Sequence, residues 1–257
     1  METWRLLNLE YPDPYRNMAV EEAILLAVER GWAPNTLRFW RNRNAVVMGH
    51  FQSVASDVNV SACIEYDTAI VRRFTGGGAV YHDLGNLNWT LAVNRIHPLI
   101  PATSLEFFRV FGQVITMGLS NIGVEAEFCP PNSILVNGGK VSGLAACVKR
   151  AAFLCHGTLL IGTDLIVLSR VLKVPKQSSK FIDEKRSVKS KPSEVTSLDQ
   201  ESRRQLDLSV VKEELVKSFE KALDIKLKNM PLTEEELILV KSLWAERYGR
   251  VEWNLGR

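Results

Sequence analysis

Three consecutive glycines, Gly76 to Gly78, lie between two runs of β-type residues and follow the pair Arg72-Arg73. Glycine lets the backbone approach a ligand closely and direct its N–H groups at an anion. An arginine just upstream can make charge-assisted bonds to a phosphate or a carboxylate. The segment therefore predicts an anion-binding loop. It is not a P-loop, because no Gly-Lys-Ser/Thr follows, and not a dinucleotide fingerprint, because a strand and not a helix comes next.

Lys140 is the second candidate for chemistry. It begins an expected strand between Gly138-Gly139 and Ser142-Gly143, so its side chain can reach inward to a negatively charged group. In a site that joins a carboxylate to a nucleotide, a fixed cation stabilises the charge that develops on the α-phosphate in the transition state.

Each of these features also has a plainer interpretation. Three glycines alone favour a hairpin turn whose arginines are solvated. A lysine at the edge of a strand is by base rate a solvated charge. His82, taken alone, is more often a hydrogen-bonded structural residue than a catalyst. The chemical interpretation therefore depends on the combination of motifs.

The composition excludes several classes of protein. The 257 residues are 46% hydrophobic and 24% charged, which is typical of a globular protein with a substantial core. No run approaches the roughly 18 apolar residues that span a bilayer, and the N-terminus lacks a secretory signal. We therefore expect a cytoplasmic protein with no membrane segment. A net charge of +3 and an isoelectric point of 8.6 are too low to indicate a nucleic-acid-binding face.

The cysteines indicate neither a disulfide framework nor a metal site. None of the four forms a Cys-x-x-Cys pair, so we expect no zinc and no other metal bound by them. Isolated thiols in a cytosolic protein are usually small buried hydrophobic groups. The four residues are Cys63, Cys129, Cys147 and Cys155.

The first part of the chain alternates short β-type runs with a helix. Residues 4–9 predict a strand. Asn17 is the expected N-cap of the helix, which stops at Gly31. Strands over 36–41 and 45–50 flank a turn-forming segment and predict a hairpin.

A longer helix over 103–123 begins with the capping-box spacing Thr103-x-x-Glu106. A group of strands over 133–137, 140–149 and 151–161 follows, with Gly138-Gly139 as a two-residue hairpin turn. Strands that meet through tight turns cannot form a purely parallel array. The sequence therefore predicts an α+β fold, a mixed and mainly antiparallel sheet flanked by helices.

The last third of the chain is charged. The segment 173–204 is rich in Lys, Ser, Glu and Asp and predicts a mobile loop or connection. Helices are expected within 208–248, over 208–223 and 233–248, the second with the capping-box spacing Thr233-x-x-Glu236. We expect the whole chain, 1–257, to form a single catalytic domain.

The combined motifs resemble the lipoate–protein ligase A family, within the superfamily of biotin/lipoate ligases and lipoyl/octanoyl transferases. The resemblance covers nearly the whole chain in the family's order. It is carried by Asn17-Met18-Ala19-Val20-Glu21-Glu22, Gly49-His50-Phe51-Gln52, Arg72-Arg73-x-Thr75-Gly76-Gly77-Gly78-Ala79-Val80-Tyr81-His82-Asp83, Gly139-Lys140-Val141-Ser142-Gly143, His156-Gly157-Thr158 and Glu252-Trp253-Asn254.

The resemblance implies a domain like those of class II aminoacyl-tRNA synthetases and biotin ligases, and a two-step reaction. Lipoate and ATP, with Mg²⁺, first give lipoyl-adenylate, and a lysine of an acceptor protein then attacks the mixed anhydride. Lys140 matches the family's catalytic lysine. The residues that match the family's binding site are Arg73, Gly77, Gly78, Ala79, Val80, Tyr81, His82, Lys140 and His156. An apolar tunnel for the acyl chain would have Val71, Ala79, Val141 and Leu144 as candidate walls.

The resemblance also implies partners. The acceptor is expected among the lipoyl domains of 2-oxoacid dehydrogenases, the glycine-cleavage H protein and similar lipoylated carriers. The chain stops at Arg257, shortly after the motif at Glu252, where larger ligases of the family continue into an accessory domain. We therefore expect the short form of the family, whose accessory domain is a separate small protein that is needed for activation.

An acyltransferase of the same superfamily is the alternative. It moves an octanoyl or lipoyl group between carrier proteins through a cysteine thioester without ATP, and so needs an accessible, activated thiol. Cys129 lies close to where one transferase branch has its nucleophile. That branch has a phenylalanine after the cysteine, a longer spacing to the lysine and an arginine at the third glycine of the loop, whereas this chain has Pro130 and Gly78. The sequence therefore favours the ligase.

A third interpretation is a binding or regulatory protein on the same scaffold, related to biotin ligases that also bind DNA. Such a protein would have an added helix-turn-helix, and nothing ahead of Trp4 resembles one. This interpretation therefore ranks below the two enzymes.

Overall fold

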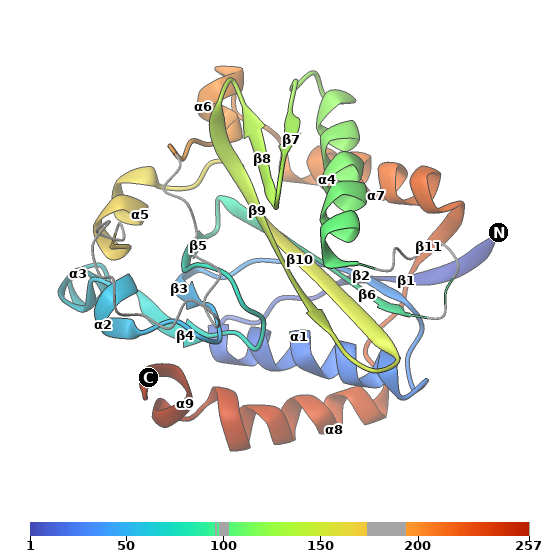
Figure 1. Cartoon of the computed structure of the whole chain (residues 1–257), viewed down its shortest axis with the longest axis horizontal. Coiled ribbons are helices and arrows are strands. Elements are labelled where there is room, and N and C mark those ends of the chain that lie inside the picture. Colours follow the sequence, from blue (N-terminus) through green and yellow to red (C-terminus); the bar gives the residue numbers. More distant parts are fainter. Residues whose placement is uncertain (96, 98–102, 174–193, 257) are drawn as a thin grey trace.

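The computed structural model describes residues 1–95, 97, 103–173 and 194–256 of the chain. Within these residues a main sheet of eight strands and a small sheet of three form the framework (Figure 1). The main sheet has the order β11 (Ile225–Asn229), β1 (Glu2–Asn8), β2 (Thr36–Trp40), β6 (Asn86–Asn94), β10 (Ala152–Leu160), β9 (Gly139–Val148), β8 (Ser133–Val136) and β7 (Glu127–Cys129). The small sheet has the order β4 (Ala69–Arg72), β3 (Asn44–Met48) and β5 (Val80–Asp83).

Most strand pairs are antiparallel. In the main sheet β1 runs parallel to β2 and β11, and the other pairs from β2 to β7 are antiparallel. In the small sheet β3 is parallel to β4 and antiparallel to β5. The expected α+β class, with a mixed and mainly antiparallel sheet flanked by helices, is confirmed.

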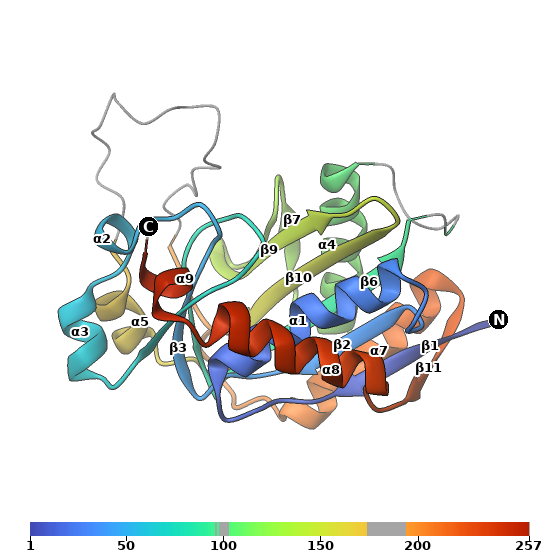
Figure 2. The same ribbon diagram turned by 90° about the horizontal axis from the view of Figure 1, so that it is seen from below.

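Helices cover the two faces of the main sheet unequally. The helices α4 (Ser104–Ser120) and α7 (Leu208–Leu223) pack together on one face and complete a large apolar core. The helix α1 (Pro14–Glu29) covers part of the other face, and α8 (Glu234–Leu243) packs against α1 (Figure 2). The small sheet lies beside α1, so this second face is shared between a helix and a sheet (Figure 1).

Alternation along β10 shows which side chains point to each face. Phe153 and Cys155 belong to the core under α4 and α7, and Ala152 and Leu154 belong to the core under α1. Side chains two residues apart share a face of a sheet, so His156 points to the α1 side. This alternation fixes the face on which polar residues of the central strands can meet.

Shorter helices complete the fold. In the small-sheet half they are α2 (Val54–Asp57), α3 (Val60–Glu65) and α5 (Leu165–Val171), which contribute to a third apolar cluster with Tyr81. A short helix, α6 (Leu198–Ser202), precedes α7. After α8 the chain makes one π-helical turn, Trp244–Tyr248, and ends its described part in α9 (Val251–Leu255), which packs on β4.

The predicted hairpin over 36–41 and 45–50 is wrong. The two strands exist as β2 and β3, but they belong to different sheets. Between them the side chain of Asn42 is buried, accepts a bond from Asn17 Nδ2 at 2.8 Å and lies 3.2 Å from His82 Nδ1. These contacts turn the chain from the main sheet into the small one, where a hairpin would have left Asn42 in water.

Asn17 is not the N-cap of the first helix. The helix begins three residues earlier, at Pro14, and Asp13 caps it by accepting from the Tyr15 backbone N–H. Proline is favoured in the first turn of a helix because the N–H that it lacks would have no acceptor within the helix there. Asn17 is buried inside the helix, and its side chain bonds to Tyr11 and Asn42.

Other element boundaries agree more closely. Thr103 caps α4, and Thr233 makes a complete capping box with Glu236 on α8, as predicted. The hairpin between β8 and β9 is also confirmed, but its two turn residues are Asn137 and Gly138, both at positive φ. Such a turn fits the twist of the strands it joins.

The segment after α7 contains a strand that was not predicted from the sequence. Residues Ile225–Asn229 form β11 and pair in parallel with β1, between the two expected helices. Of the expected mobile segment 173–204, residues 174–193 lie outside the described part of the chain. Glu194 and Thr196 are described, and their backbones bond to that of Lys140.

A buried ion pair ties α8 to β1, and it gives a testable prediction. Arg5 donates to both carboxylate oxygens of Glu236, and the two side chains are 1% and 0% exposed. We expect Glu236→Gln to lower the free energy of unfolding by about 3 kcal/mol or more, because it leaves a buried guanidinium without its counter-charge. Urea unfolding followed by circular dichroism measures the change.

A surface ion pair provides the control. Lys217 and Glu213 on α7 are more than half exposed, so Glu213→Gln should change the same free energy by less than about 1 kcal/mol. Equal, small effects of the two substitutions would show that the Arg5 pair does not fix α8.

Candidate active site

The glycine loop, residues 74–79, connects β4 to β5, and Arg73 at its start is nearly buried. Nη2 of Arg73 donates to the carbonyls of Gly76 at 2.7 Å and Gly78 at 2.8 Å. Its Nε donates to Thr75 Oγ1 at 3.0 Å, and its Nη1 to the Val47 carbonyl at 2.9 Å. Burial lowers the pKa of Arg73 to about 10, so it is charged at neutral pH. In this structure its charge shapes the loop.

The loop presents two backbone donors. The carbonyls of Gly76 and Gly78 point at Arg73, and a trans peptide directs its N–H opposite to its C=O. The N–H groups of Gly77 and Ala79 therefore point away from Arg73, and neither has an acceptor within the part of the chain that is described. Such paired donors can bind an anion or the oxygen of a polarised carbonyl.

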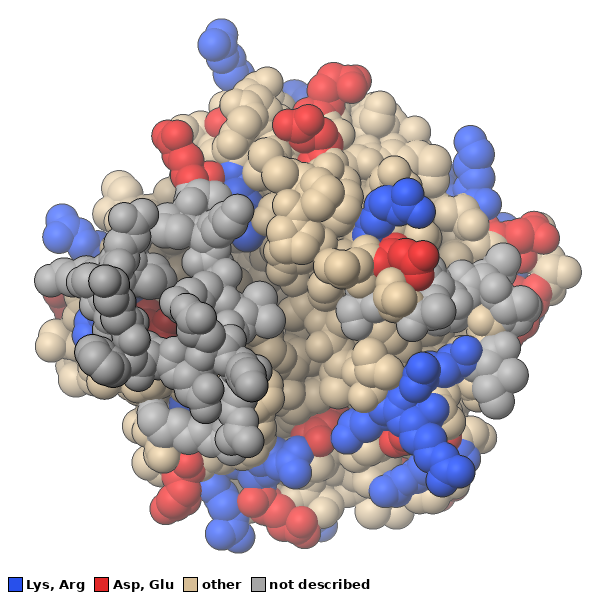
Figure 3. All heavy atoms as spheres, in the orientation of Figure 1, with Lys and Arg blue, Asp and Glu red and all other residues tan. Residues whose placement is uncertain are grey.

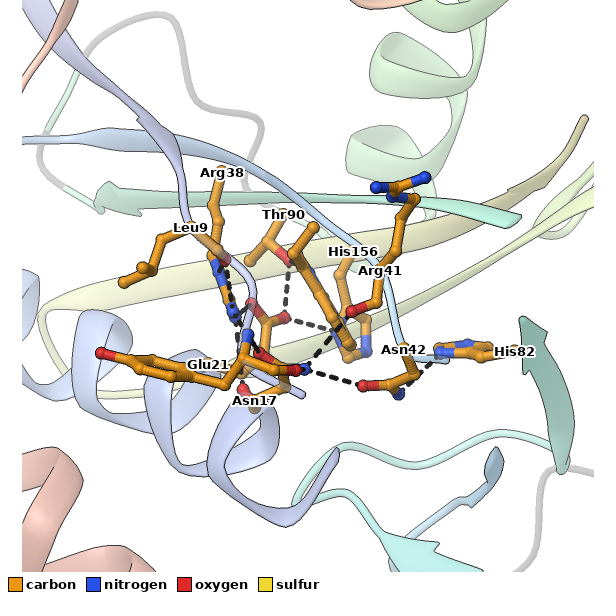
Figure 4. A network of polar contacts seen from close by, with 11 residues as sticks. Leu9, Asn17, Glu21, Arg38, Arg41, Asn42, His82, Thr90 and His156 are labelled. Carbon is orange, nitrogen blue, oxygen red and sulfur yellow. Dashed lines mark hydrogen bonds and ion pairs between the residues drawn. The ribbon is translucent and has the colours of Figure 1, made fainter. Parts of the chain in front are cut away.

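His156 on β10 connects this loop to α1 (Figure 4). Its Nδ1 lies 3.1 Å from Glu21 Oε2, and its Nε2 lies 2.9 Å from Thr75 Oγ1. A carboxylate only accepts hydrogen bonds, so Nδ1 carries a proton, and in the tautomer with an unprotonated Nε2 that nitrogen accepts from the Thr75 hydroxyl. Both ring nitrogens of His156 are thus used inside the protein.

Glu21 is a buried carboxylate with three partners. Besides His156 it accepts from Arg38 Nη1 on β2 at 2.7 Å and from Thr90 Oγ1 on β6 at 2.6 Å. Burial alone would raise the pKa of Glu21, but the hydrogen bond from His156 and the charge of Arg38 outweigh it and lower the pKa. Glu21 is therefore ionised throughout the physiological range.

His82 does not connect the glycine loop to α1 through Glu21 as His156 does. Asn17 donates to Asn42 Oδ1, so the amide Nδ2 of Asn42 is left to donate to His82 Nδ1 at 3.2 Å (Figure 4). His82 then carries its proton on Nε2, which is buried and has no partner among the described residues. Burial, followed by the charge of Arg73, lowers the pKa of His82 to about 3. The ring stays neutral.

The edge of the main sheet places Cys129 on the same face as His156. On β7, Phe128 packs into the core under α4, so Cys129 points to the opposite face. Cys129 pairs with Ser133, and Ser133 pairs with Gly143. Directly opposite residues share a face, and Cys129 is partly exposed there.

A β-bulge places Lys140 beside them. Leu135 pairs with Lys140 but Ile134 pairs with Ser142, so β9 carries one extra residue at this point. The extra residue moves Lys140 onto the face of Gly143, and the Lys140 Nζ lies 3.4 Å from where a Cβ on Gly143 would be. Burial lowers the pKa of Lys140, and the nearby Cys129 opposes this shift because a thiolate favours the ammonium.

The glycine loop and β9 meet through small residues. A Cβ on Gly77 would lie 3.8 Å from the Ala145 methyl group, two residues beyond Gly143 on β9. The loop therefore covers the face that carries Lys140 and Cys129. Figure 3, in the orientation of Figure 1, shows mainly uncharged atoms near the middle of the view, with charged side chains around them. An uncharged surface of this kind suits an acyl chain.

The sequence-predicted site residues are only partly brought together. Gly77, Gly78, Ala79 and Val80 lie on or beside the loop, and His156 bonds to Thr75 within it. Tyr81 instead points into the third apolar cluster, where burial and Asp83 raise its pKa to about 12. Direct contact of these residues with a ligand stays a prediction.

The candidate tunnel walls do not lie together. Val141 and Leu144 belong to the core under α4 and α7, whereas Val71 belongs to the core under α1. Ala79 packs against the third cluster. Side chains that belong to three separate clusters cannot line one tunnel, so this assignment is wrong.

Sequence reasoning missed Glu21, Thr75 and Arg38 as parts of the site. Glu21 gave a usable signal, because it is an acidic residue on a helix whose neighbours Val20, Ala23 and Ile24 are apolar and fully buried. A carboxylate within such a surface must have a partner. The partners come from distant strands and could not be named without the fold.

Arg72 joins the loop region to the end of the chain. Its guanidinium donates to the carbonyls of Gln52 at 2.6 Å, Trp253 at 3.0 Å and Asn254 at 3.2 Å. In return Asn254 Oδ1 accepts from the Arg72 backbone N–H at 2.9 Å. The helix α9 is thereby attached to the strand that leads into the glycine loop.

Comparison with known proteins places this geometry in a family. Residues 13–220 match the lipoyl protein ligase A/B catalytic domain. The chain belongs to this family. Membership identifies it as an enzyme of lipoyl transfer, and the family expected from the motifs is confirmed.

The relatives correct the expected reaction. An octanoyltransferase LipM of Brevibacillus brevis is 31% identical, with 100% of both chains covered. A lipoate–protein ligase A subunit 1 of Thermoplasma acidophilum is 33% identical, with 98% of this chain and 96% of the relative covered. Most relatives of highest similarity are named octanoyltransferase LipM. The prediction of an ATP-dependent lipoate ligase is therefore wrong, and the alternative, the acyltransferase, fits better.

Solved structures show the same fold. A bi-partite lipoate protein ligase of T. acidophilum, solved in a study with its E2 lipoyl domain, has TM-score 0.86 and 30% identity, covering 100% and 97% of the two chains. A T. acidophilum structure with bound lipoic acid has TM-score 0.84 and 28% identity, covering 100% of both. A lipoate–protein ligase A bound with ATP has TM-score 0.85 and 29% identity, covering 100% and 99%. Proteins of this fold thus bind lipoate and ATP.

Two further features concern membranes and metals. Among the described residues, no helix is long and apolar enough to cross a bilayer. The same residues contain no group of three or more His, Cys, Asp or Glu side chains arranged to bind a metal ion.

The burial of His82 predicts a pH dependence of stability. Its pKa is about 3 in the folded protein and near 6.5 when exposed, so below pH 6.5 the unfolded chain binds the proton more tightly. Stability is unaffected above this pH and falls by about 1.4 kcal/mol per pH unit as the pH drops further towards 3. We expect His82→Gln to remove this part of the slope in unfolding measured between pH 7.5 and 5. An unchanged slope would contradict it.

Proposed function

We propose that this protein is a cysteine-dependent acyltransferase, which moves an octanoyl or lipoyl group from a carrier-protein thioester to a lysine of an acceptor domain. The supporting observation is that the pairing of β7, β8 and β9 places Cys129 and Lys140 on the same face of the main sheet, which the glycine loop approaches at Ala145. The octanoyltransferase relatives support the same reaction. The sequence departs from one transferase branch in residue identity, at Pro130 and Gly78, and in the spacing from Cys129 to Lys140. The bulge at Lys140 changes what that spacing means in space.

The depressed pKa of Lys140 gives the pair its chemistry. Burial disfavours the ammonium form of Lys140, and a free amine at this position can accept the proton of a nearby thiol. The thiolate, not the thiol, is the nucleophile. Lys140 is therefore the base that activates Cys129.

In the first step the Cys129 thiolate attacks the carbonyl carbon of the donor thioester. The new bond is S–C, and the oxygen becomes an oxyanion to which Gly77 and Ala79 can donate their free N–H groups. The bond from carbon to the carrier sulfur then breaks. The leaving thiolate takes the proton stored on Lys140, so the carrier departs as a thiol and Cys129 holds the acyl group.

In the second step the amine of the acceptor lysine attacks the acyl–Cys129 thioester. A C–N bond forms, the C–S bond breaks, and one proton passes from the nitrogen to the released thiolate, with Lys140 placed to relay it. The products are an amide and free Cys129. Neither step needs ATP or Mg²⁺, because the donor thioester is already activated. The accessory protein expected from the sequence serves adenylation and has no part in this reaction.

Partners follow from this chemistry. The donor is an acyl group on a carrier thiol. The acceptor is a lysine presented by a lipoyl domain, in line with the solved T. acidophilum ligase and its E2 lipoyl domain, or by a similar lipoylated carrier such as the glycine-cleavage H protein. The acyl chain lies along β9 beside the glycine loop, where Gly143 has no side chain and Ala145 only a methyl group.

Intact-mass measurement tests the proposal. The full chain is incubated with an octanoyl carrier thioester and an unmodified lipoyl domain, without nucleotide. We expect one octanoyl group on the enzyme before the acceptor is added and on the acceptor afterwards. Cys129→Ser should abolish the transfer. Lys140→Ala should slow it by about 100-fold or more, because general-base help is lost.

Cys147 supplies the matched control. It is another partly exposed cysteine on β9, and Cys147→Ser should transfer normally. A parallel reaction contains octanoate or lipoate with ATP and Mg²⁺ in place of the thioester. Modification of the acceptor only in that reaction, with no acyl group on Cys129, would overturn the transferase.

A further inference from the structure

Glu21 and His156 are absent from the chemical steps above, yet hydrogen bonds hold both side chains in place beside the loop. Both ring nitrogens of His156 are bonded within the protein, to Glu21 and to Thr75. His156 therefore has no ring nitrogen left for an acyl group or a nucleotide. Any effect of His156 on the substrate must therefore be indirect, through the residues that it contacts.

We propose that Glu21 and His156 are positioning residues that act on the glycine loop through Thr75 and Arg73. The inference rests on the proposed acyl transfer at Cys129. The chain of contacts is Arg38 to Glu21 to His156 to Thr75 to Arg73, and it ends on the carbonyls of Gly76 and Gly78.

Each contact in the chain fixes the next. The Glu21 carboxylate requires the proton of His156 on Nδ1, which makes Nε2 an acceptor. Nε2 then orients the Thr75 hydroxyl hydrogen towards itself, and a lone pair of that oxygen is left for the Arg73 Nε–H. If the group at this position instead donated a hydrogen bond to Thr75 Oγ1, it would compete with the Arg73 Nε–H for that oxygen.

Arg73 connects the oriented Thr75 hydroxyl to the backbone of the loop. Its Nη2 fixes two loop carbonyls, and the N–H groups of Gly77 and Ala79 face the other way. These are the donors for the oxyanion in the first chemical step. A donor must lie close to the place where the charge develops, so a small displacement of the loop weakens stabilisation of the transition state.

Thr75 offers the sharpest test, because its hydroxyl can be removed at nearly constant volume. Thr75→Val leaves His156 Nε2 without a donor and takes Thr75 Oγ1 from Arg73, whereas Thr75→Ser keeps the hydroxyl. We expect Thr75→Val to slow acylation of Cys129 by octanoyl thioester by roughly 10- to 100-fold, in line with lost positioning of transition-state donors. Thr75→Ser should retain a rate near that of the wild type. Rapid quench with mass detection measures the single-turnover rate.

A second reaction of the same thiol separates positioning from structural damage. Alkylation of Cys129 by iodoacetamide needs the thiolate but no oxyanion donor. We therefore expect Thr75→Val to alkylate at the wild-type rate while its acylation is slow. Glu21→Gln should show the same pattern if it folds, but it leaves the buried charge of Arg38 unpaired, so the Thr75 variants carry the test.

Thr68→Val is the matched control. Thr68 is also buried in the small-sheet half, and its hydroxyl donates to Asn44 Oδ1 at 2.9 Å. It should acylate and alkylate normally even where it lowers the melting temperature. Normal acylation by Thr75→Val, equal slowing by Thr75→Ser, or parallel slowing of alkylation would each overturn the positioning role. Absence of acyl–Cys129 in the wild type would instead overturn the proposed function.

Discussion

A carboxylate without access to water, that of Glu21, constrains the rest of the structure. An ionised group at 1% exposure costs several kcal/mol unless charges and donors surround it. Its partners come from β2, β6 and β10, so one side chain on α1 fixes the helix against three strands of the main sheet. The same carboxylate sets the tautomer of His156, from which the order of the glycine loop follows. The Glu21 carboxylate therefore stabilises both the packing of α1 and the arrangement of the candidate site.

The unequal cover of the main sheet explains where the site lies. One face is packed by α4 and α7 with aromatic and aliphatic side chains, which makes the sheet a rigid base. The other face is divided between α1 and the small sheet, and small residues such as Gly143 and Ala145 let the Lys140 side chain and the glycine loop lie close to β9. Reactive groups on rigid strands, beneath a loop with free backbone donors, are the arrangement that acyl transfer requires.

The sequence predicted local features well and long-range ones poorly. Thr103 and Thr233 mark helix starts because a cap depends on a few neighbouring residues. The glycine loop and Lys140 could be singled out because their composition is unusual for a turn and a strand. The crossing at Asn42 depends on Asn17 and His82, which lie 25 and 40 residues away, so pattern alone gave a false hairpin. The bulge on β9 lies within the hairpin to β8, but nothing in the local pattern marks it. The choice between ligase and transferase was corrected by the relatives, most of which are named octanoyltransferase LipM.

The attachment of Asn254 to Arg72 has a consequence for how the protein is made. Strand β4 leads into the reactive loop, yet some of its polar groups find their partners only 182 residues later. During synthesis on the ribosome, the guanidinium of Arg72 can bond early to the carbonyls of Gly49, His50 and Gln52. Its bonds to Trp253 and Asn254 form only after α9 has left the exit tunnel. The main sheet's central strands can assemble earlier, because β10 is finished by residue 160. The nascent chain can thus form the contacts of the glycine loop with Arg73 and His156 first, and the attachment of β4 to α9 comes last.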